Sequence, residues 1–386
     1  MKEIKMPEYN HSILNTITSI LKHYNVETNH NSLEVLDNKL SKNHKNVVLI
    51  ILDGLGEHIL KNISPNGFFS KNEVDCVTSV FPSTTTAALT TYYSGKPPYE
   101  SGWIAWSQYF KEYGRAIDML SHKESYKGES LKDANVDVFK TIINYEPIFY
   151  QIEKASTEVK AYEIMPSYSD RRAKHTIKAD TVEEMVENIE MLCSTPDKKF
   201  AMAYCDNPDG IMHKYGTDSQ EAADFLLDAE KQIENMCKNL DDTIVIISAD
   251  HGHLNVENPH SILDYSEILE CLYMPAAFEA RTLTFWVKED MKNVFEERFN
   301  NLFKDEFLLM TKDEFIEQKH FLGYGTKHPK VDDFIGNYVA VSISNSMINL
   351  GNLLADGKKL KKSTHCGLTC EEMEVPLIIY EQKTKS

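Results

Sequence analysis

The stretch "NVVLIILDGLG", residues 46–56, is a short apolar run that ends in an Asp-Gly pair. Every position from Val47 to Leu52 is apolar, so the run does not alternate between apolar and polar residues. This continuous pattern is typical of a strand that is buried on both faces of a parallel sheet. We therefore predict a buried parallel strand here, followed by a loop that begins at Asp53.

The same design of an apolar strand followed by an Asp-rich loop occurs twice more, in "KKFAMAYCDNPDG" (198–210) and "DDTIVIISADHG" (241–252). A fourth apolar strand, "EVPLIIYEQ", covers residues 374–382. Helical patterns at 180–194 and 219–240 separate these strands. The alternation predicts an α/β fold with a mainly parallel central sheet flanked by helices.

The sequence pattern of residues 255–345 differs from that of the rest of the chain. They contain "RTLTFWVKED" (281–290), a helical pattern at 291–303 and the Gly-rich "FLGYGTKHPKVDD" (321–333). We predict that residues 255–345 form a smaller cap subdomain, inserted into a main domain made of residues 1–254 and 346–386.

The chain of 386 residues is 42% hydrophobic, which is enough for a sizeable core. It carries 41 Lys and Arg against 59 Asp and Glu, a formal charge of −18. Such a surface repels nucleic-acid backbones and anionic membranes, so we expect neither as a partner. An anionic small substrate would need local positive charge, which bound metal ions would supply.

The cysteine pattern and the first residues of the chain predict a cytoplasmic protein. Seven Cys are scattered, with an odd count and no Cys-x-x-Cys pair, as expected of reduced thiols. The apolar residues near the N-terminus recur at helical spacing and form no continuous core of signal-peptide length. The oligomeric state has no signature in the sequence.

Carboxylates and imidazoles gather where the predicted strands end. Ligands of open α/β sheets bind at the carboxyl ends of the strands, so these side chains are candidate site residues. Along the chain they are Asp53, then Asp209 and His213, then Asp250 and His251, and finally His365 just before the fourth strand.

Each of these residues alone has a structural explanation. An Asp after a strand is most often a turn or helix-capping residue, and an Asp and a His four residues apart can be a surface ion pair. Asp and His at three successive strand ends, however, are what a centre for two metal ions needs. Carboxylate and neutral imidazole suit zinc or a similar divalent ion.

A further stretch, "VFPSTTTAALTTYYSG" (80–95), places three threonines at the start of a predicted helix. The threonines could cap the helix or face its polar side, and one of them could also be a nucleophile. Both roles are compatible, because the N-terminus of a helix favours anions such as phosphate.

The order of these motifs resembles the alkaline phosphatase superfamily, and within it the type I phosphodiesterase and nucleotide pyrophosphatase branch. The motifs are "LDGLG" (52–56), "FPSTT" (81–85), Asp-x-x-x-His-x-Tyr-Gly (209–216), "ADHG" (249–252) and "THCGL" (364–368) followed by "VPLI" (375–378). The resemblance implies a phosphohydrolase with two divalent metal ions, zinc or alternatively manganese, and a small phosphorylated substrate.

The resemblance also implies a role for each candidate residue. One metal ion is expected on Asp53, Thr85, Asp250 and His251, and the other on Asp209, His213 and His365. Thr85 is the implied nucleophile, because it lies three residues after Pro82 and ten before Gly95. Thr84 is the alternative, one residue out of register. His253 is expected to support the metal ligands from behind, although it could also touch the substrate.

The sequence departs from this family in two respects that affect the substrate. The family's "FPNHY" motif after the nucleophile is absent, and the family's oxyanion-binding Asn is replaced. Trp106 lies where the phosphodiesterases have an Asn that binds a phosphoryl oxygen. We expect the replacement contact to come from the Thr86 backbone N–H, Ser107 or Gln108.

These departures leave several activities open. Cleavage of phosphodiester or pyrophosphate bonds through a phospho-threonine intermediate is the favoured function. The same site could hydrolyse phosphomonoesters or phosphonates. A phosphomutase and a non-catalytic binding protein on an inherited fold are the alternatives from other classes.

Overall fold

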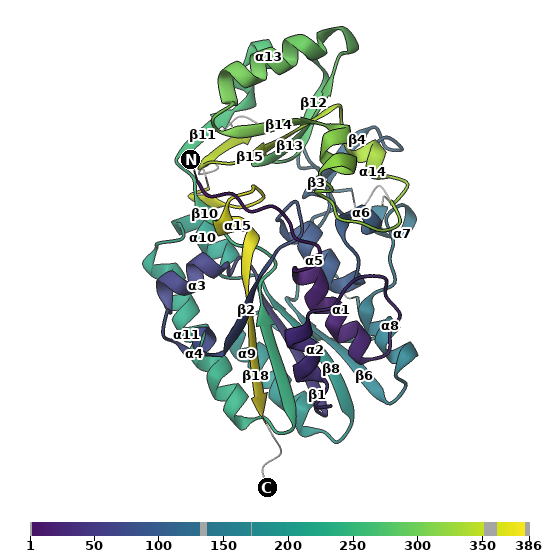
Figure 1. Cartoon of the computed structure of the whole chain (residues 1–386), viewed down its shortest axis with the longest axis vertical. Helices are drawn as coiled ribbons and strands as arrows, with labels where there is room; N and C mark the ends of the chain where they lie inside the picture. Colours follow the sequence, from purple (N-terminus) through teal and green to yellow (C-terminus); the bar gives the residue numbers. More distant parts are fainter. Residues whose placement is uncertain (1, 132–136, 171, 351–360, 383–386) are drawn as a thin grey trace.

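The structure is a computed structural model that describes residues 2–131, 137–170, 172–350 and 361–382. Its centre is a seven-stranded sheet in which β1 lies between β9 and β8 (Figure 1). In spatial order the strands are β2 (Glu73–Thr78), β18 (Glu374–Gln382), β9 (Thr243–Ser248), β1 (Asn46–Leu52), β8 (Lys198–Cys205), β6 (Val159–Met165) and β7 (His175–Lys178).

The sheet is mainly parallel, as predicted. Strands β9, β1, β8, β6 and β7 pair in parallel, whereas β18 is antiparallel to both of its neighbours. Every residue of β1 is buried, in agreement with its continuous apolar pattern. Because β18 is antiparallel, it begins at the edge where β1, β8 and β9 end, and this brings the segment before β18 to the same edge.

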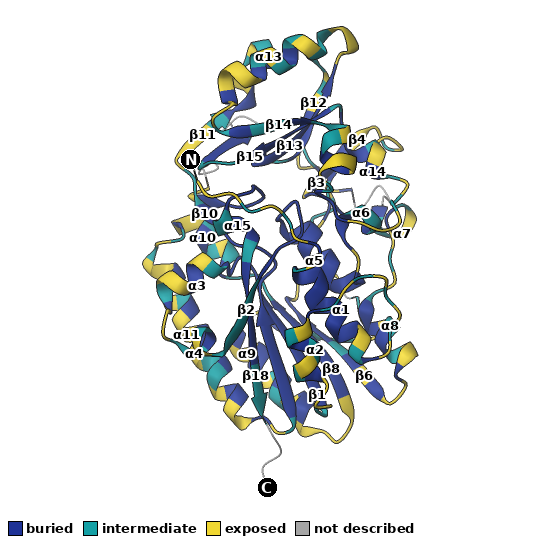
Figure 2. Ribbon diagram, viewed as in Figure 1, coloured by how far each residue is buried: buried dark blue, intermediate teal, exposed yellow. Residues whose placement is uncertain are grey.

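Helices cover both faces of the sheet (Figure 1). Helices α1 (Ile13–His23), α2 (Glu34–Leu40), α5 (Thr85–Ser94) and α8 (Ile148–Ala155) pack together on one face. Helices α3 (Glu57–Ile63), α4 (Phe68–Asn72), α9 (Val182–Ser194), α10 (Asp209–Tyr215) and α11 (Gln220–Asn239) pack on the other. Helices α1, α9 and α11 match the predicted helical patterns. In Figure 2 the central strands of the sheet are buried, the edge strands β2 and β7 are partly exposed, and the exposed residues lie on the outer sides of the helices and in loops.

A second, four-stranded sheet lies beyond the edge of the first sheet where β1, β8 and β9 end (Figure 1). Its spatial order is β12 (Leu272–Glu279), β13 (Thr282–Val287), β15 (Tyr338–Ser342) and β14 (Phe307–Thr311). Helix α13 (Lys292–Phe303) packs on it through Phe295, Phe299 and Phe303. A small sheet of β3 (Ser107–Phe110), β4 (Arg115–Asp118) and β5 (Lys123–Glu124) lies beside β12. The division at residues 255–345 stays a proposal, and buried residues of 103–131 and 137–143 pack in the same hydrophobic cluster as residues of this cap.

Short elements connect these parts. They are α6 (Pro98–Ser101), α7 (Val138–Thr141), β10 (Leu254–Asn255), β11 (Asn258–Ser261), η1 (Ile262–Asp264), α12 (Ser266–Leu269), η2 (Glu289–Met291), the π-helix η3 (Glu314–Gln318), α14 (Val331–Phe334), β16 (Ser346–Asn349), β17 (Ser363–Thr364) and α15 (Cys370–Met373).

A fully buried ion pair joins the second sheet to the segment before β18. Arg281 donates to both carboxylate oxygens of Glu372, at 2.6 and 2.7 Å, and neither side chain is exposed. Glu372 also accepts the backbone N–H of Gly367 at 2.7 Å. The pair therefore holds the loop that follows His365.

We predict that Arg281→Met lowers the free energy of unfolding by about 3–5 kcal/mol, because it leaves the Glu372 carboxylate buried without its counter-charge. Arg298→Met is the matched control. Arg298 is one-third exposed and pairs with Glu270 at 3.4 Å, so its loss should cost less than about 1 kcal/mol. Urea unfolding followed by circular dichroism measures both, and equal losses would contradict the assignment.

Candidate active site

The predicted site residues meet at the edge of the central sheet where β1, β8 and β9 end. Asp53 directly follows β1, and Asp250 follows β9 after one intervening residue. Asp209 begins α10 after β8. The backbone links these ends, since Asp53 N–H donates to the Cys205 carbonyl and Asp209 N–H donates to the Asp53 carbonyl. Gly54 has a φ of +77°, and a Cβ there would lie 3.1 Å from Asp209 Cα, so the turn after Asp53 requires glycine.

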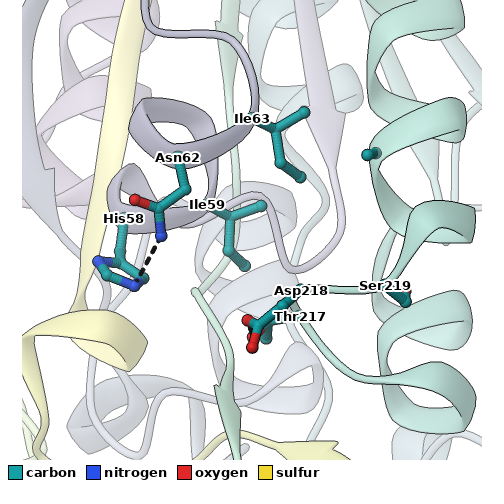
Figure 3. Close-up of a pocket in the computed structure, with 8 residues that line it drawn as sticks. His58, Ile59, Asn62, Ile63, Thr217, Asp218 and Ser219 are labelled. Carbon is teal, nitrogen blue, oxygen red and sulfur yellow. Dashed lines mark hydrogen bonds between the residues drawn. The ribbon is translucent and has the colours of Figure 1, made fainter.

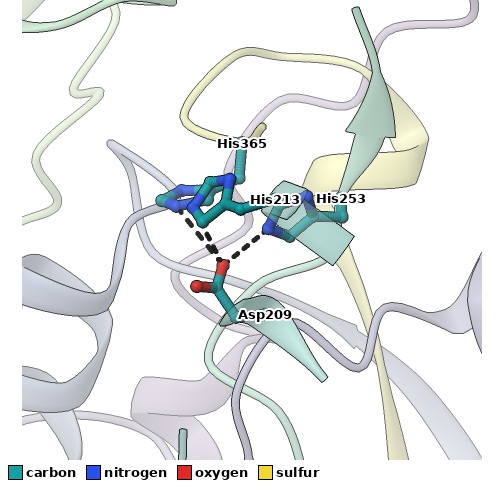
Figure 4. Close-up of side chains that lie close together, drawn as sticks. All are labelled: Asp209, His213, His253 and His365. Carbon is teal, nitrogen blue, oxygen red and sulfur yellow. Dashed lines mark hydrogen bonds and ion pairs between the residues drawn. The ribbon is translucent and has the colours of Figure 1, made fainter. Parts of the chain in front are cut away.

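Three imidazoles converge on one carboxylate oxygen, Oδ1 of Asp209 (Figure 4). The Nε2 atoms of His253, His213 and His365 lie 2.5, 3.4 and 3.7 Å from it. Asp209 and His213 are four residues apart on α10 and therefore share a helix face. His253 thus lies within the cluster itself, in contact with Asp209.

A second cluster contains Asp53, Asp250, His251 and Thr85. Nε2 of His251 lies 3.5 Å from Asp53 Oδ1, 3.4 Å from Asp250 Oδ2 and 3.3 Å from Thr85 Oγ1. Thr85 Oγ1 is 3.4 Å from Asp53 Oδ2. The two clusters adjoin, because the rings of His251 and His365 stack with centroids 3.8 Å apart.

The four histidines all present Nε2 to a carboxylate. The Nδ1 atoms of His213, His251 and His365 lie 2.8–3.0 Å from the backbone carbonyls of Ser363, Gly252 and Ser83, which can only accept. Nδ1 must therefore carry the proton, which leaves a lone pair on each Nε2 when the ring is neutral.

His253 follows the same logic through a hydroxyl. Ser363 Oγ donates to the Met212 carbonyl at 2.6 Å, so it accepts from His253 Nδ1 at 3.0 Å. The Nε2 lone pair of neutral His253 then faces Asp209 Oδ1 at 2.5 Å. Two acceptors at that distance repel, so a shared proton or a cation must lie between them.

Burial favours the neutral form of three of the imidazoles and disfavours the charge on Asp53. Burial lowers the pKa of His213 to about 3 and also lowers the pKa of His253 and His365. Burial, reinforced by the charges of Asp250 and Asp209, raises the pKa of Asp53 well above its usual value. Neutral imidazoles with free lone pairs and crowded carboxylates favour a bound cation.

The two clusters fit divalent metal ions. Asp53 Oδ1 and Asp250 Oδ2 are buried and have no hydrogen-bond partner, which is rare for a carboxylate oxygen. The donor set of carboxylates, imidazoles and one hydroxyl is the set that zinc and similar ions take.

Thr85 is the first residue of α5, and Thr84 is its N-cap. The first backbone bond of the helix runs from Ala88 N–H to the Thr84 carbonyl at 2.9 Å. The amides of Thr85, Thr86 and Ala87 therefore have no acceptor within the helix. Of the structural roles open to the threonines, a side-chain cap is not made by Thr84, because it forms no such bond. The Oγ1 atoms of Thr84 and Thr86 are both buried without a partner.

The sequence profile of type I phosphodiesterase / nucleotide pyrophosphatase matches residues 47–324. The chain belongs to this family. It is therefore a hydrolase of phosphoester or related bonds, within a superfamily whose members cleave phosphodiesters, pyrophosphates or phosphonates. No curated protein matches the sequence.

Solved structures share the fold at low sequence identity. Murine ectonucleotide pyrophosphatase / phosphodiesterase 5, solved as an inactive threonine-to-alanine variant with AMP, is 17% identical with a TM-score of 0.63. The human form is 16% identical with a TM-score of 0.64. Phosphonoacetate hydrolase from Sinorhizobium meliloti 1021, solved with phosphonoformate, is 16% identical with a TM-score of 0.60. Each match covers 88% of this chain and 90% of the other. Among the described residues we find no helix with the length and apolarity that a membrane crossing requires.

Two of the three expected replacements for the family's oxyanion-binding Asn are engaged elsewhere. Gln108 is buried and bonds the backbone at Ile104, Ala105 and Gly102. Ser107 Oγ donates to Ser125 Oγ at 2.7 Å. The expectation for these two side chains is therefore wrong, and the Thr86 amide at the start of α5 is the candidate that stays.

Trp106 contacts the cap instead of the site. Its backbone N–H donates to Oε1 of Glu279, the last residue of β12, at 2.9 Å, and the residue is 38% exposed. Glu279 lies beside Thr84, and burial raises the pKa of its carboxyl. The cap thus brings an acidic residue next to the N-terminus of α5.

Two tyrosines at the site were not predicted. Tyr204 lies on β8 opposite Ile51 of β1, and its hydroxyl donates to Asp53 Oδ2. An aromatic hydroxyl in an otherwise apolar strand was the available signal. Tyr168 is 70% exposed and donates to Asp206 Oδ2 at 2.8 Å, in the loop that leads to Asp209. No motif pointed to Tyr168.

A separate pocket of about 430 Å³ lies between α3 and the segment that joins α10 to α11 (Figure 3). His58 and Asn62 are hydrogen-bonded to each other on its wall at 2.9 Å. None of the predicted site residues lines this pocket, and the metal-ligand type clusters lie elsewhere.

We predict that Tyr204→Phe lowers the free energy of unfolding of the metal-free protein by about 1.5–3 kcal/mol, because it removes a hydrogen bond to a charged group. Tyr92→Phe is the control, since the buried Tyr92 hydroxyl donates to the neutral Ala249 carbonyl at 3.1 Å. That loss should cost about 0.5–1.5 kcal/mol. Chemical denaturation compares the two, and a cost for Tyr204→Phe no greater than for Tyr92→Phe would contradict the role of Tyr204.

Proposed function

We propose that this protein is a metal-dependent phosphohydrolase that cleaves phosphodiester or pyrophosphate bonds of a small substrate through a phospho-threonine intermediate on Thr85. The observation that carries the proposal is the place of Thr85 Oγ1, within 3.4 Å of both Asp53 Oδ2 and His251 Nε2 at the start of α5. The inactive threonine-to-alanine form of the murine relative supports a threonine nucleophile.

Two divalent ions, zinc or alternatively manganese, would bind the two clusters. Asp53, Thr85, Asp250 and His251 would hold one, and Asp209, His213 and His365 the other, with His253 in contact with Asp209. When bound, such ions lower the pKa of a coordinated hydroxyl or water and offset the charge on phosphate oxygens.

The chain's own residues set the geometry of the reaction. Thr85 Oγ1 gives up its proton and forms the new bond to phosphorus as the bond to the leaving oxygen breaks, and the leaving group keeps the electron pair and takes up a proton. The amides at the start of α5, including that of Thr86, face the phosphoryl oxygens. Water then forms a bond to the same phosphorus, and Thr85 Oγ1 leaves and regains a proton.

The relatives favour two kinds of substrate. The murine enzyme was solved with AMP, and the phosphonoacetate hydrolase with phosphonoformate. Hydrolysis of a phosphonate in the same site is therefore the second candidate function. A panel of nitrophenyl monoester, diester and phosphonate substrates beside nucleotides, tested on zinc- or manganese-loaded protein, separates these activities.

We also propose a reducing compartment, the cytoplasm, for this protein. All seven cysteines are free thiols in the structure, as the sequence predicted. The prefix in the name of the ectonucleotide relatives describes those proteins, and we do not carry it over to this chain.

We predict that the purified protein holds about two divalent ions per chain, because two separate ligand clusters are present. His213→Ala and Asp250→Ala should each lower the metal content by about one ion, since they belong to different clusters. His58→Ala, a histidine outside both clusters, should leave it unchanged. Elemental analysis measures the metal content of the wild type and of all three variants. One ion or none in the reconstituted wild type would contradict the two-metal proposal.

Thr85→Ala should abolish turnover of every substrate while the protein stays folded, because no other hydroxyl of the described residues bonds to both Asp53 and His251. Thr85→Ser should keep partial activity, since a hydroxyl stays and only the methyl group that restricts its rotamer is lost. Thr84→Ala is the matched control, because it removes the same hydroxyl from the neighbouring buried residue. Single-turnover labelling and peptide mass spectrometry locate the phosphate, and phosphate on Thr84 would place the nucleophile one residue earlier.

A further inference from the structure

Lys361 places an ammonium group at the open side of the Asp209 cluster. Its Nζ lies 2.9 Å from Nε2 of His213, the atom that also faces Asp209. Because Nδ1 of His213 is bonded to the Ser363 carbonyl, Nε2 is the acceptor in this contact. A cation therefore already lies where the lone pair of His213 points.

The backbone fixes this position. Lys362 N–H donates to the His213 carbonyl at 2.9 Å, and the Lys362 carbonyl accepts from Val256 N–H at 2.9 Å. The next residue, Ser363, pairs with Asn255 in the β10–β17 ladder. Lys361 is thus tethered one residue from a fixed segment, and its exposed side chain can reach the site without movement of the backbone.

The charge of Lys361 is not neutralised by a carboxylate in the part of the chain that the structure describes. No ion pair is present between Lys361 and any described acidic side chain, whereas Lys327, Lys330 and Lys39 all pair with carboxylates. Within the site, Asp209 Oδ1 lies 3.4 Å from the same His213 Nε2 atom, and the charge of Lys361 also acts on Glu279 of the cap. The ammonium of this exposed side chain is therefore available to an anion that enters the site.

A merely structural role does not explain Lys361. A hydrogen bond from Nζ to His213 Nε2 would compete with any ion bound there. With Nε2 taken up by an ion, the ammonium is displaced toward the solvent-facing side of the cluster and is free to meet an anion. Lys acts as a mobile point charge on phosphate and carboxylate groups in such sites.

We propose that Lys361 contacts the leaving group and makes the enzyme selective for substrates whose leaving group carries its own negative charge beside the scissile bond. A pyrophosphate bond and a phosphonate that bears a carboxylate both have this chemistry, whereas a simple aryl diester does not. The inference rests on the proposed function: because Thr85 attacks from the Asp53, Asp250 and His251 cluster, an in-line displacement would place the leaving oxygen on the side of the Asp209 cluster.

The test compares two substrates that transfer the same group. Thymidine triphosphate and thymidine 5′-(4-nitrophenyl phosphate) share the transferred nucleotidyl group and differ only in the leaving group. Lys361→Met should lower kcat/KM for the triphosphate by about tenfold or more and change the nitrophenyl ester by less than about threefold. Lys361→Arg should keep most of the preference. Lys362→Met, the same charge change one residue away, should alter neither.

A binding measurement gives a readout that does not depend on turnover. In metal-loaded Thr85→Ala protein, calorimetry with inorganic pyrophosphate should show about tenfold weaker binding when Lys361→Met is added, with an unchanged metal content. Equal loss on both substrates together with loss of metal would show that Lys361 serves only the metal cluster, and would overturn the inference. No change in either assay would overturn it as well.

The two proposals fail in different ways. If the wild type cleaves both substrates and Lys361→Met does not discriminate, only the role of Lys361 is wrong. If the wild type cleaves neither substrate although two ions are bound, the proposed function is wrong, and pyrophosphate calorimetry then decides the role of Lys361 alone.

Discussion

Three carboxylates packed at one edge of a parallel sheet are the constraint on which the rest of the structure depends. Asp53 and Asp250 are almost fully buried, and Asp209 lies beside them. Each of the two buried groups is fixed through one oxygen and left open at the other. Asp250 Oδ1 accepts from the backbone amides of Gly54 and His251, while Asp53 Oδ2 accepts from Tyr204, and their remaining oxygens have no partner. Such an arrangement is unfavourable without a cation, because buried charges of like sign repel and lack water.

The parts of the fold that could be predicted are those with a distinct local pattern. Strand β1 is apolar throughout because both of its faces are buried, and this pattern is visible in the sequence. Strand β6 was not predicted, because it carries a lysine, a tyrosine and a glutamate among its apolar residues. The antiparallel direction of β18 could not be predicted either, since an apolar run has the same composition in both directions.

The candidate site shows the same division. Carboxylates and imidazoles at strand ends can be recognised in the sequence, so the candidate ligands, of which Asp53 is the first and His365 the last, could be proposed from the sequence alone. Contacts made by the backbone leave no such mark. The engagement of Gln108 with three backbone groups, and of Trp106 N–H with Glu279, depends on how the cap packs. A threonine at an N-cap position need not cap the helix with its hydroxyl, and Thr84 forms no such hydrogen bond.

The cap is coupled to the site by its two ends. Leu254 pairs with Thr364, so the segments that enter and leave the cap lie side by side next to His253 and His365. From within the cap, Arg281 holds Glu372, which in turn accepts from Gly367. The Gly367 carbonyl accepts from Ser83 Oγ, and the Ser83 carbonyl accepts from His365 Nδ1. A continuous path of hydrogen bonds thus runs from the cap through a buried ion pair to a candidate ligand. A displacement of the cap would therefore have to break a buried charged contact before it could move His365.

The acidity of the chain is compatible with an anionic substrate because charge acts locally. At physiological ionic strength the Debye length is about 8 Å, so most of the excess surface charge is screened from the site. Within the site, two divalent ions and Lys361 would outweigh Asp53, Asp209, Asp250 and Glu279, which leaves a net charge of about +1. Glu279 beside Thr84 and Lys361 beside His213 make this field uneven, with its positive side toward the Asp209 cluster. An uneven field of this kind distinguishes the two ends of a substrate, so the charge on the leaving group becomes a property that the site can select.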